Sequence, residues 1–88
     1  MAWTDYHTLK EIDEACALPK GSAFRAFKRL LPELREGGDF LWLEAGVHAP
    51  EIAALKRDGR LYPTTVNALL FTAQGRSRLL SALGLPDR

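Results

Sequence analysis

Apolar residues in the first third of the chain recur at helical spacing in two short runs. In the first run, Leu9, Ile12 and Cys16 fall on one side, which predicts an amphipathic helix. Thr8 and Glu11 match the S/T-x-x-E capping box, in which each side chain accepts a hydrogen bond from a free backbone N–H, so the helix should begin there. The opposite side should face water and carries four charged residues: Lys10, Glu11, Asp13 and Glu14.

The second run, LPKGSAFRAFKRLL, predicts another helix. Phe24, Phe27 and Leu31 are spaced to form one apolar, buried face. Pro19 ends the first helix, because it lacks an N–H and biases the preceding residue away from helical conformation. A proline is also tolerated in the first turn of the next helix, where Ser22 can cap free N–H groups. Two short helices joined by a tight turn are therefore expected.

The second half of the chain alternates strands and helices. Residues 39–44 read DFLWLE, in which side chains alternate between two faces, and this pattern favours a strand. Residues 50–58 open with a proline and end before a glycine, which predicts a short helix. The residue types of 64–71 favour a second strand that pairs with the first. A threonine cap and three leucines predict a last helix over 72–84.

The resulting order, α-α-β-α-β-α, predicts an α+β winged helix-turn-helix domain with a two-stranded antiparallel hairpin. A chain of 88 residues allows one small domain, and 47% hydrophobic residues with 26% charged is typical of a folded one. Trp3 should either dock on the domain or lie in a dimer interface. The predicted parts of the single domain 1–88 are an N-terminal arm (1–7), a helix-turn-helix (8–31), a strand-helix-strand wing region (39–71) and a C-terminal helix (72–84).

Positive charge is concentrated in the second predicted helix, although the formal net charge of the whole chain is only +1. Residues 20–35 hold five basic side chains against one acid. A helix-turn-helix places side chains near the start of its second helix against base edges in the major groove. The alternative is that these basic side chains form the solvated face of an amphipathic helix and bind nothing. For double-stranded DNA, we expect base contacts from Lys20, Ser22 and Arg25, and phosphate contacts from Lys28, Arg29 and Arg35.

A second basic cluster lies between the two predicted strands, where a winged fold has its wing. It consists of Lys56, Arg57 and Arg60. Phosphate contact is one interpretation of this cluster. An exposed helix end is the other, because basic residues favour helix C-termini in any case.

No motif for catalysis stands out. His7, His48 and Cys16 lack metal-ligand spacing, and neither a glycine-rich phosphate loop nor a nucleophile elbow is found in the sequence. We therefore expect no enzyme activity, no cofactor and no metal. The lack of a signal-peptide pattern and the single cysteine predict a cytoplasmic protein. The longest apolar runs fall far short of the roughly 20 residues that cross a bilayer, so no membrane association is expected.

Two parts of the chain resemble known regulators. TLKEIDEACALPKGSAFRAFK resembles the helix-turn-helix opening of small winged-helix bacterial and phage regulators of the MerR and excisionase type. EGGDFLWL with NALLFTAQGRSRLLSAL is similar to the ending of phage antirepressor-like DNA-binding domains. The resemblance implies a recognition helix over 20–29 and a wing over 44–63. Ala17 stands where these families usually have a glycine before the turn, and residues 50–58 replace a simple wing.

The sequence thus predicts non-catalytic binding of double-stranded DNA by a transcriptional or mobile-element regulator that acts as a homodimer. The near-neutral charge supports an alternative, a protein-interaction module on the same fold that acts as an adaptor or antirepressor. A third interpretation, RNA or single-strand binding through Phe40, Trp42 and Phe71, is disfavoured, because these aromatic residues are expected in the core.

Overall fold

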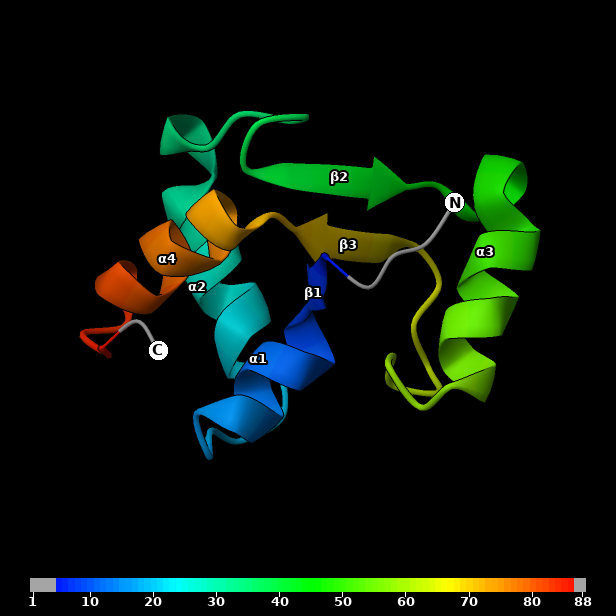
Figure 1. Cartoon of the computed structure of the whole chain (residues 1–88), viewed down its shortest axis with the longest axis horizontal. Helices are drawn as coiled ribbons and strands as arrows, with labels where there is room; N and C mark the ends of the chain where they lie inside the picture. The colour runs from blue at the N-terminus through cyan, green and yellow to red at the C-terminus, as the bar shows by residue number, and fades with distance from the viewer. Residues whose placement is uncertain (1–4, 87–88) are drawn as a thin grey trace.

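The computed structural model of the chain describes residues 5–86 (Figure 1). Within these residues the chain forms a small α+β domain, which confirms the predicted class. Its helices and strands, in chain order, are β1 (His7–Thr8), α1 (Leu9–Ala15), α2 (Ser22–Leu30), the 3₁₀ helix η1 (Leu31–Glu33), β2 (Phe40–Leu43), α3 (Ala45–Arg57), β3 (Ala68–Phe71) and α4 (Ala73–Ala82).

The sheet is antiparallel and has the strand order β1-β3-β2. Phe71 of the central strand lies opposite His7 on one side and Phe40 on the other. The predicted two-stranded hairpin is therefore wrong, because the described part of the chain contributes a third strand. β1 is too short to show an alternating pattern, and its His7 falls within the predicted N-terminal arm. Residues 1–4 of that arm, including Trp3, lie outside the described residues.

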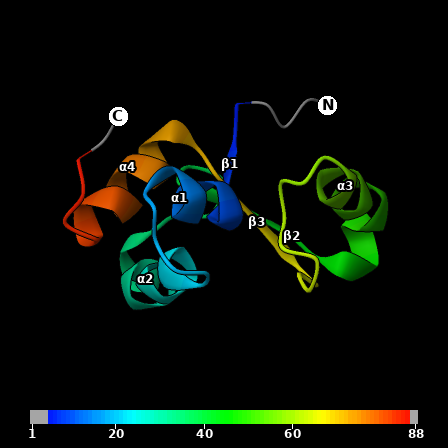
Figure 2. The same ribbon diagram turned by 90° about the horizontal axis from the view of Figure 1, so that it is seen from below.

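Each face of the sheet covers its own hydrophobic core. α1, α2 and α4 lie on one side of the strands and α3 on the other (Figure 2). In the first core, the ring of Phe27 stands edge-on to Phe40 and Phe71, at centroid distances of 5.2 and 5.6 Å. The second core joins α3 and the segment after it to the sheet and consists of Leu43, Ile52, Leu55, Leu61, Ala68 and Leu70. The alternation along β3 divides its side chains between the two cores.

The buried face of α2 differs from the predicted one. Ala23, Ala26 and Phe27 are buried, whereas Phe24 is 42% exposed and Leu31 is 43% exposed. The prediction was therefore right for Phe27 and wrong for the other two. The small alanine side chains let α2 pack closely against its neighbours, and this rotates Phe24 to the edge of the contact.

The connection between α1 and α2 contains the only non-glycine residue with a positive φ among residues 5–86, Ala17 at 54°. This left-handed conformation favours glycine, so the alanine at this position is strained. The capping box of α1 is present as predicted: Thr8 Oγ1 accepts from the Glu11 N–H, and the Glu11 carboxylate accepts from the Thr8 N–H.

The remaining elements lie close to their predicted positions but differ in length. α3 begins at Ala45 rather than Pro50, and its backbone leaves the helical region at His48, just before the proline. β3 is shorter than predicted because a turn and a bend precede Ala68, where the strand begins. α4 has the predicted threonine cap and buries Leu79 and Leu80. No helix in the described range is long and apolar enough to cross a bilayer.

Candidate nucleic-acid interface

Asp13 of α1 fixes the start of α2. The sequence places this side chain on the water-facing side of α1, but it is only 1% exposed, so that prediction is wrong. Its carboxylate accepts hydrogen bonds from the N–H groups of Gly21 and Ala23, at 3.0 and 2.9 Å, and from the hydroxyl of Tyr62, at 2.7 Å. Asp13 therefore caps α2 from a neighbouring helix. Ser22 does not cap α2, because its hydroxyl donates to the carbonyl of Pro19 instead.

The outward face of α2 carries three exposed basic side chains: Arg25, Lys28 and Arg29. The Nζ of Lys28 lies 4.9 Å from the ring centroid of Phe24. A guanidinium nitrogen of Arg25 is 3.4 Å from the hydroxyl of Ser22. Within residues 5–86, none of the three basic groups forms an ion pair with a carboxylate. Their charge is therefore available to an external anion.

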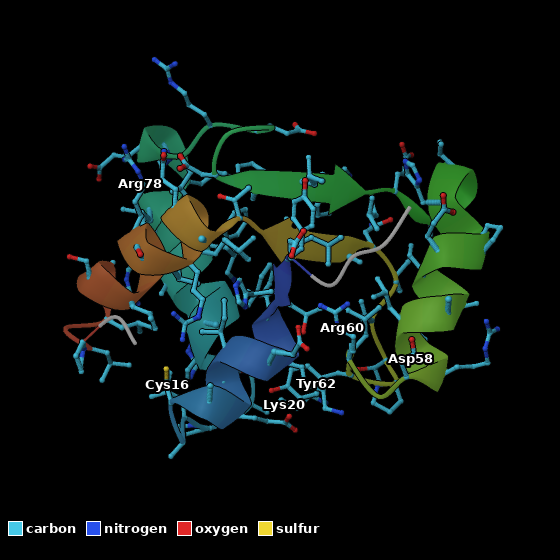
Figure 3. The ribbon with its side chains drawn as sticks, viewed as in Figure 1. Cys16, Lys20, Asp58, Arg60, Tyr62 and Arg78 are labelled. Atoms are coloured by element: carbon cyan, nitrogen blue, oxygen red, sulfur yellow. The ribbon has the colours of Figure 1, made fainter. Side chains whose placement is uncertain are left out.

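Lys20 precedes α2 and extends this face. Its Nζ lies 4.9 Å from the centroid of the Tyr62 ring, and the two side chains lie together beside α1 (Figure 3). The structure thus brings together five of the predicted interface residues along one helix and the turn before it: Lys20, Ser22, Arg25, Lys28 and Arg29.

Arg60 has a different environment. Its guanidinium makes two hydrogen bonds of 3.0 Å to the carboxylate of Glu11 and one of 2.7 Å to the carbonyl of Tyr6, and its side chain is 19% exposed. Burial raises the pKa of Glu11, but hydrogen bonds from Arg60 and Thr8 more than offset it, so that pKa is lowered. Arg60 joins the N-terminal segment to the segment after α3, and we leave it out of the interface.

The other predicted contacts are not part of α2. Lys56 and Arg57 are in the last turn of α3, and the two views place α2 and α3 on opposite sides of the sheet (Figures 1 and 2). Arg35 follows η1, and its backbone N–H donates to the buried carboxylate of Asp39 at 2.9 Å. This hydrogen bond is the main cause of the lowered pKa of Asp39; burial opposes it, while Gln74 and Arg78 reinforce it.

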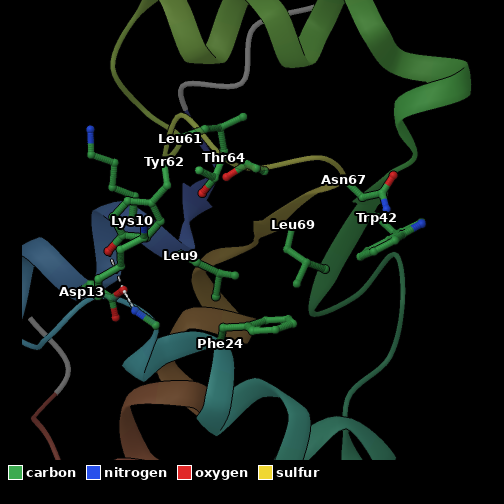
Figure 4. Close-up of a pocket in the computed structure, with 13 residues that line it drawn as sticks. Leu9, Lys10, Asp13, Phe24, Trp42, Leu61, Tyr62, Thr64, Asn67 and Leu69 are labelled. Atoms are coloured by element: carbon green, nitrogen blue, oxygen red, sulfur yellow. Dashed lines mark hydrogen bonds between the residues drawn. The ribbon is translucent and has the colours of Figure 1, made fainter.

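An apolar groove lies beside α2 and was not expected from the sequence. It has a volume of about 410 Å³ and runs between α2 and the segment that follows α3 (Figure 4). Phe24 and Trp42 stand on its walls, Leu69 lies between them, and Leu9 lies next to Phe24 on the side away from Trp42 (Figure 4). Trp42 is 43% exposed, so its predicted place in the core is wrong, whereas Phe40 and Phe71 are buried as predicted.

The described residues contain no cluster of three His, Cys, Asp or Glu side chains that could hold a metal ion. Comparisons of the chain with protein-family models, with curated proteins and with solved structures found no match.

Proposed function

We propose that this protein binds double-stranded DNA without catalysis, with α2 as the recognition helix, and regulates transcription or a mobile element. The observation that carries the proposal is the outward face of α2. It presents Arg25, Lys28 and Arg29 without a carboxylate partner among residues 5–86. Guanidinium groups can donate bidentately to guanine or phosphate, and an ammonium acts as a point charge on phosphate.

The winged-helix assignment belongs to the same proposal. α1 and α2 would supply the helix-turn-helix, and β2 and β3 the two wing strands, with α3 enlarging the connection between them. Regulators of this kind read two half-sites about 34–36 Å apart as dimers, so a homodimer is the form expected on DNA.

The affinity must come from side chains and not from the start of α2. Free N–H groups at a helix N-terminus can hold a phosphate, but the Asp13 carboxylate accepts from two of them here and adds negative charge. Each phosphate contact contributes about 0.9 to the slope of log affinity against log salt. On a random duplex, which offers no specific base contacts, Lys20, Arg25, Lys28 and Arg29 would all contact phosphate. Four such contacts predict a loss of roughly 100-fold between about 50 and 200 mM salt.

Fluorescence anisotropy with a random labelled duplex at these two salt concentrations tests the proposal. Arg25→Ala/Arg29→Ala should weaken binding at low salt by about tenfold or more and flatten the salt dependence, because two contacts are lost. The matched control is Lys56→Ala/Arg57→Ala, which removes the same charge from α3 and should change affinity less than about threefold.

Two results would contradict the proposal. Equal losses in the two double variants would mean general charge attraction and not a recognition helix. A wild-type protein that fails to bind at low salt would favour the alternative function, a protein-interaction module, and a search for a protein partner would follow.

A further inference from the structure

The groove beside α2 has the size and lining of a small-molecule site. Its volume of about 410 Å³ lies within the range of about 300–1,000 Å³ that is usual for such sites. Three aromatic side chains line it from three different parts of the chain: Phe24 on α2, Trp42 on β2 and Tyr62 after α3. Flat walls of this kind stack best against a flat ligand.

The two most exposed aromatic side chains of this lining are those that a ligand would cover. Phe24 is 42% exposed and Trp42 is 43% exposed, although both adjoin the first core. Leu69 forms an apolar floor between them, and Leu9 extends the apolar surface beyond Phe24 (Figure 4). Burying such surface supplies most of the affinity of a small apolar ligand.

One end of the groove is positively charged. Lys10 and Lys20 line it there, close to the N-terminus of α2. Lys10 donates to the carbonyl of Gly59 at 2.7 Å and lies 4.0 Å from a Glu14 carboxylate oxygen. Lys20 forms no ion pair with a carboxylate within residues 5–86. Its ammonium can therefore pair with a ligand anion.

The acid at this end reduces the positive charge but does not cancel it, because two ammonium groups line the groove there against one carboxylate. Asp13 is the one carboxylate among the described lining residues, and its oxygens already accept three hydrogen bonds, including one from the hydroxyl of Tyr62. Burial, together with this hydrogen bond and the charge of Asp13, raises the pKa of Tyr62 to about 12, so the phenol stays protonated and keeps donating.

From this arrangement we propose that the groove binds a small planar aromatic carboxylate, with its ring on the apolar floor between the aromatic walls and its carboxylate at Lys20. A cation of the same shape is disfavoured because it would meet Lys10 and Lys20. An aliphatic acid would lose the stacking on Phe24 and Trp42.

Such a ligand would also regulate the function proposed above, and this part of the inference rests on that function. Lys20 is one of the groups offered to DNA, and Phe24 belongs to α2 itself. A carboxylate that pairs with Lys20 removes one DNA contact, so ligand and DNA should weaken each other's binding by the same factor.

The experiment titrates the full chain with naphthoate, and in parallel with naphthylmethylamine, which has the same rings and the opposite charge. Binding is followed by two-dimensional NMR through the indole N–H signal of Trp42, assigned with the help of a Trp3→Phe variant. Naphthoate should shift this signal and bind at least about fivefold more tightly than the amine, because the exposed Lys20 ammonium attracts the acid and repels the amine.

Three variants locate the site. Phe24→Ala should weaken naphthoate binding at least about tenfold, because stacking and buried area are lost. Lys20→Gln removes the charge at an exposed position and keeps a polar side chain there, so it should remove the preference for the acid over the amine. Leu31→Ala, a change at an equally exposed apolar residue outside the groove, should leave binding unchanged.

The proposal is overturned if naphthoate causes no shift at millimolar concentration, if the amine binds as tightly, or if Phe24→Ala and Leu31→Ala behave alike. If neither compound binds, a protein partner or a second copy of the chain is the next occupant to test. Since no DNA is present in these titrations, their failure is distinct from a failure of DNA binding.

Discussion

Gly75 shows how much a single residue can constrain this fold. It lies in the first turn of α4, where a Cβ built on it would overlap the backbone of Asp39. The same stretch of backbone accepts hydrogen bonds from the N–H and the hydroxyl of Thr72. α4 and the start of β2 therefore meet without room for a side chain.

We predict that Gly75→Ala destabilises the protein by about 1–3 kcal/mol, because the backbone must shift to admit a methyl group. The matched control is Gly46→Ala in α3, where nothing lies within 4 Å of the added Cβ. That change should be neutral or stabilise by up to about 1 kcal/mol, since alanine favours helix. Urea unfolding measures both variants, and equal free energies of unfolding would contradict the close approach at Gly75.

At the scale of elements, the sequence predicts the two helices well and their attachment poorly. The capping pair Thr8 and Glu11 and the break at Pro19 are local signals, and the structure confirms both. The burial of Asp13 is not a local signal, because one of its partners, Tyr62, is 49 positions away. In the sequence Asp13 stands among charged neighbours, which is the pattern of a solvated face.

Removing the Asp13 carboxylate should loosen α2 from α1. We expect Asp13→Ala to lower the free energy of unfolding by roughly 2–4 kcal/mol, since two capped N–H groups and a partly buried hydroxyl lose their acceptor. Tyr62→Phe removes one of these hydrogen bonds and should cost only about 1 kcal/mol. Thermal and urea unfolding compare the two, and an equal cost would mean that Asp13 acts through Tyr62 and not as a cap.

The same restriction to local patterns explains which parts of the candidate site the sequence predicts. The basic residues of α2 are adjacent in sequence, and the structure keeps them together on one helix. The groove combines Phe24, Trp42 and Tyr62 from distant segments, and no local pattern indicates that they meet. Phe40 and Trp42 are two residues apart on β2 and therefore share one face of the strand. α2 covers only the Phe40 end of that face, so Phe40 is buried and Trp42 is exposed.

The whole molecule should lose stability in acid. Asp39 and Glu11 have pKa values below their ordinary values of 3.8 and 4.5. A carboxylate with a lowered folded pKa stabilises the fold above its unfolded pKa and loses this effect as the pH falls through the folded value. Stability from these two groups is therefore fully present at neutral pH and declines as the pH drops below about 4.5.

We expect the thermal midpoint to be nearly constant between about pH 7 and 5 and to fall steadily towards about pH 3. Asp39→Asn should be less stable at neutral pH and should show a shallower fall, because one of the two titrating groups is gone. Circular dichroism at each pH gives the midpoints. A midpoint that rises in acid, or an unchanged slope in the Asn variant, would contradict this assignment.

The order in which the strands are synthesised has a consequence of its own. β3 is the middle strand, yet it is the last of the three to leave the ribosome, and both of its neighbours wait for it. Until residues 68–71 emerge, the nascent chain can form helices but not this sheet, and the apolar face of β2 stays uncovered. The sheet can therefore form only after residues 68–71 have been synthesised. A polypeptide that ends before Ala68 could not form the sheet, and its exposed apolar surface should make it a substrate for chaperones and proteases.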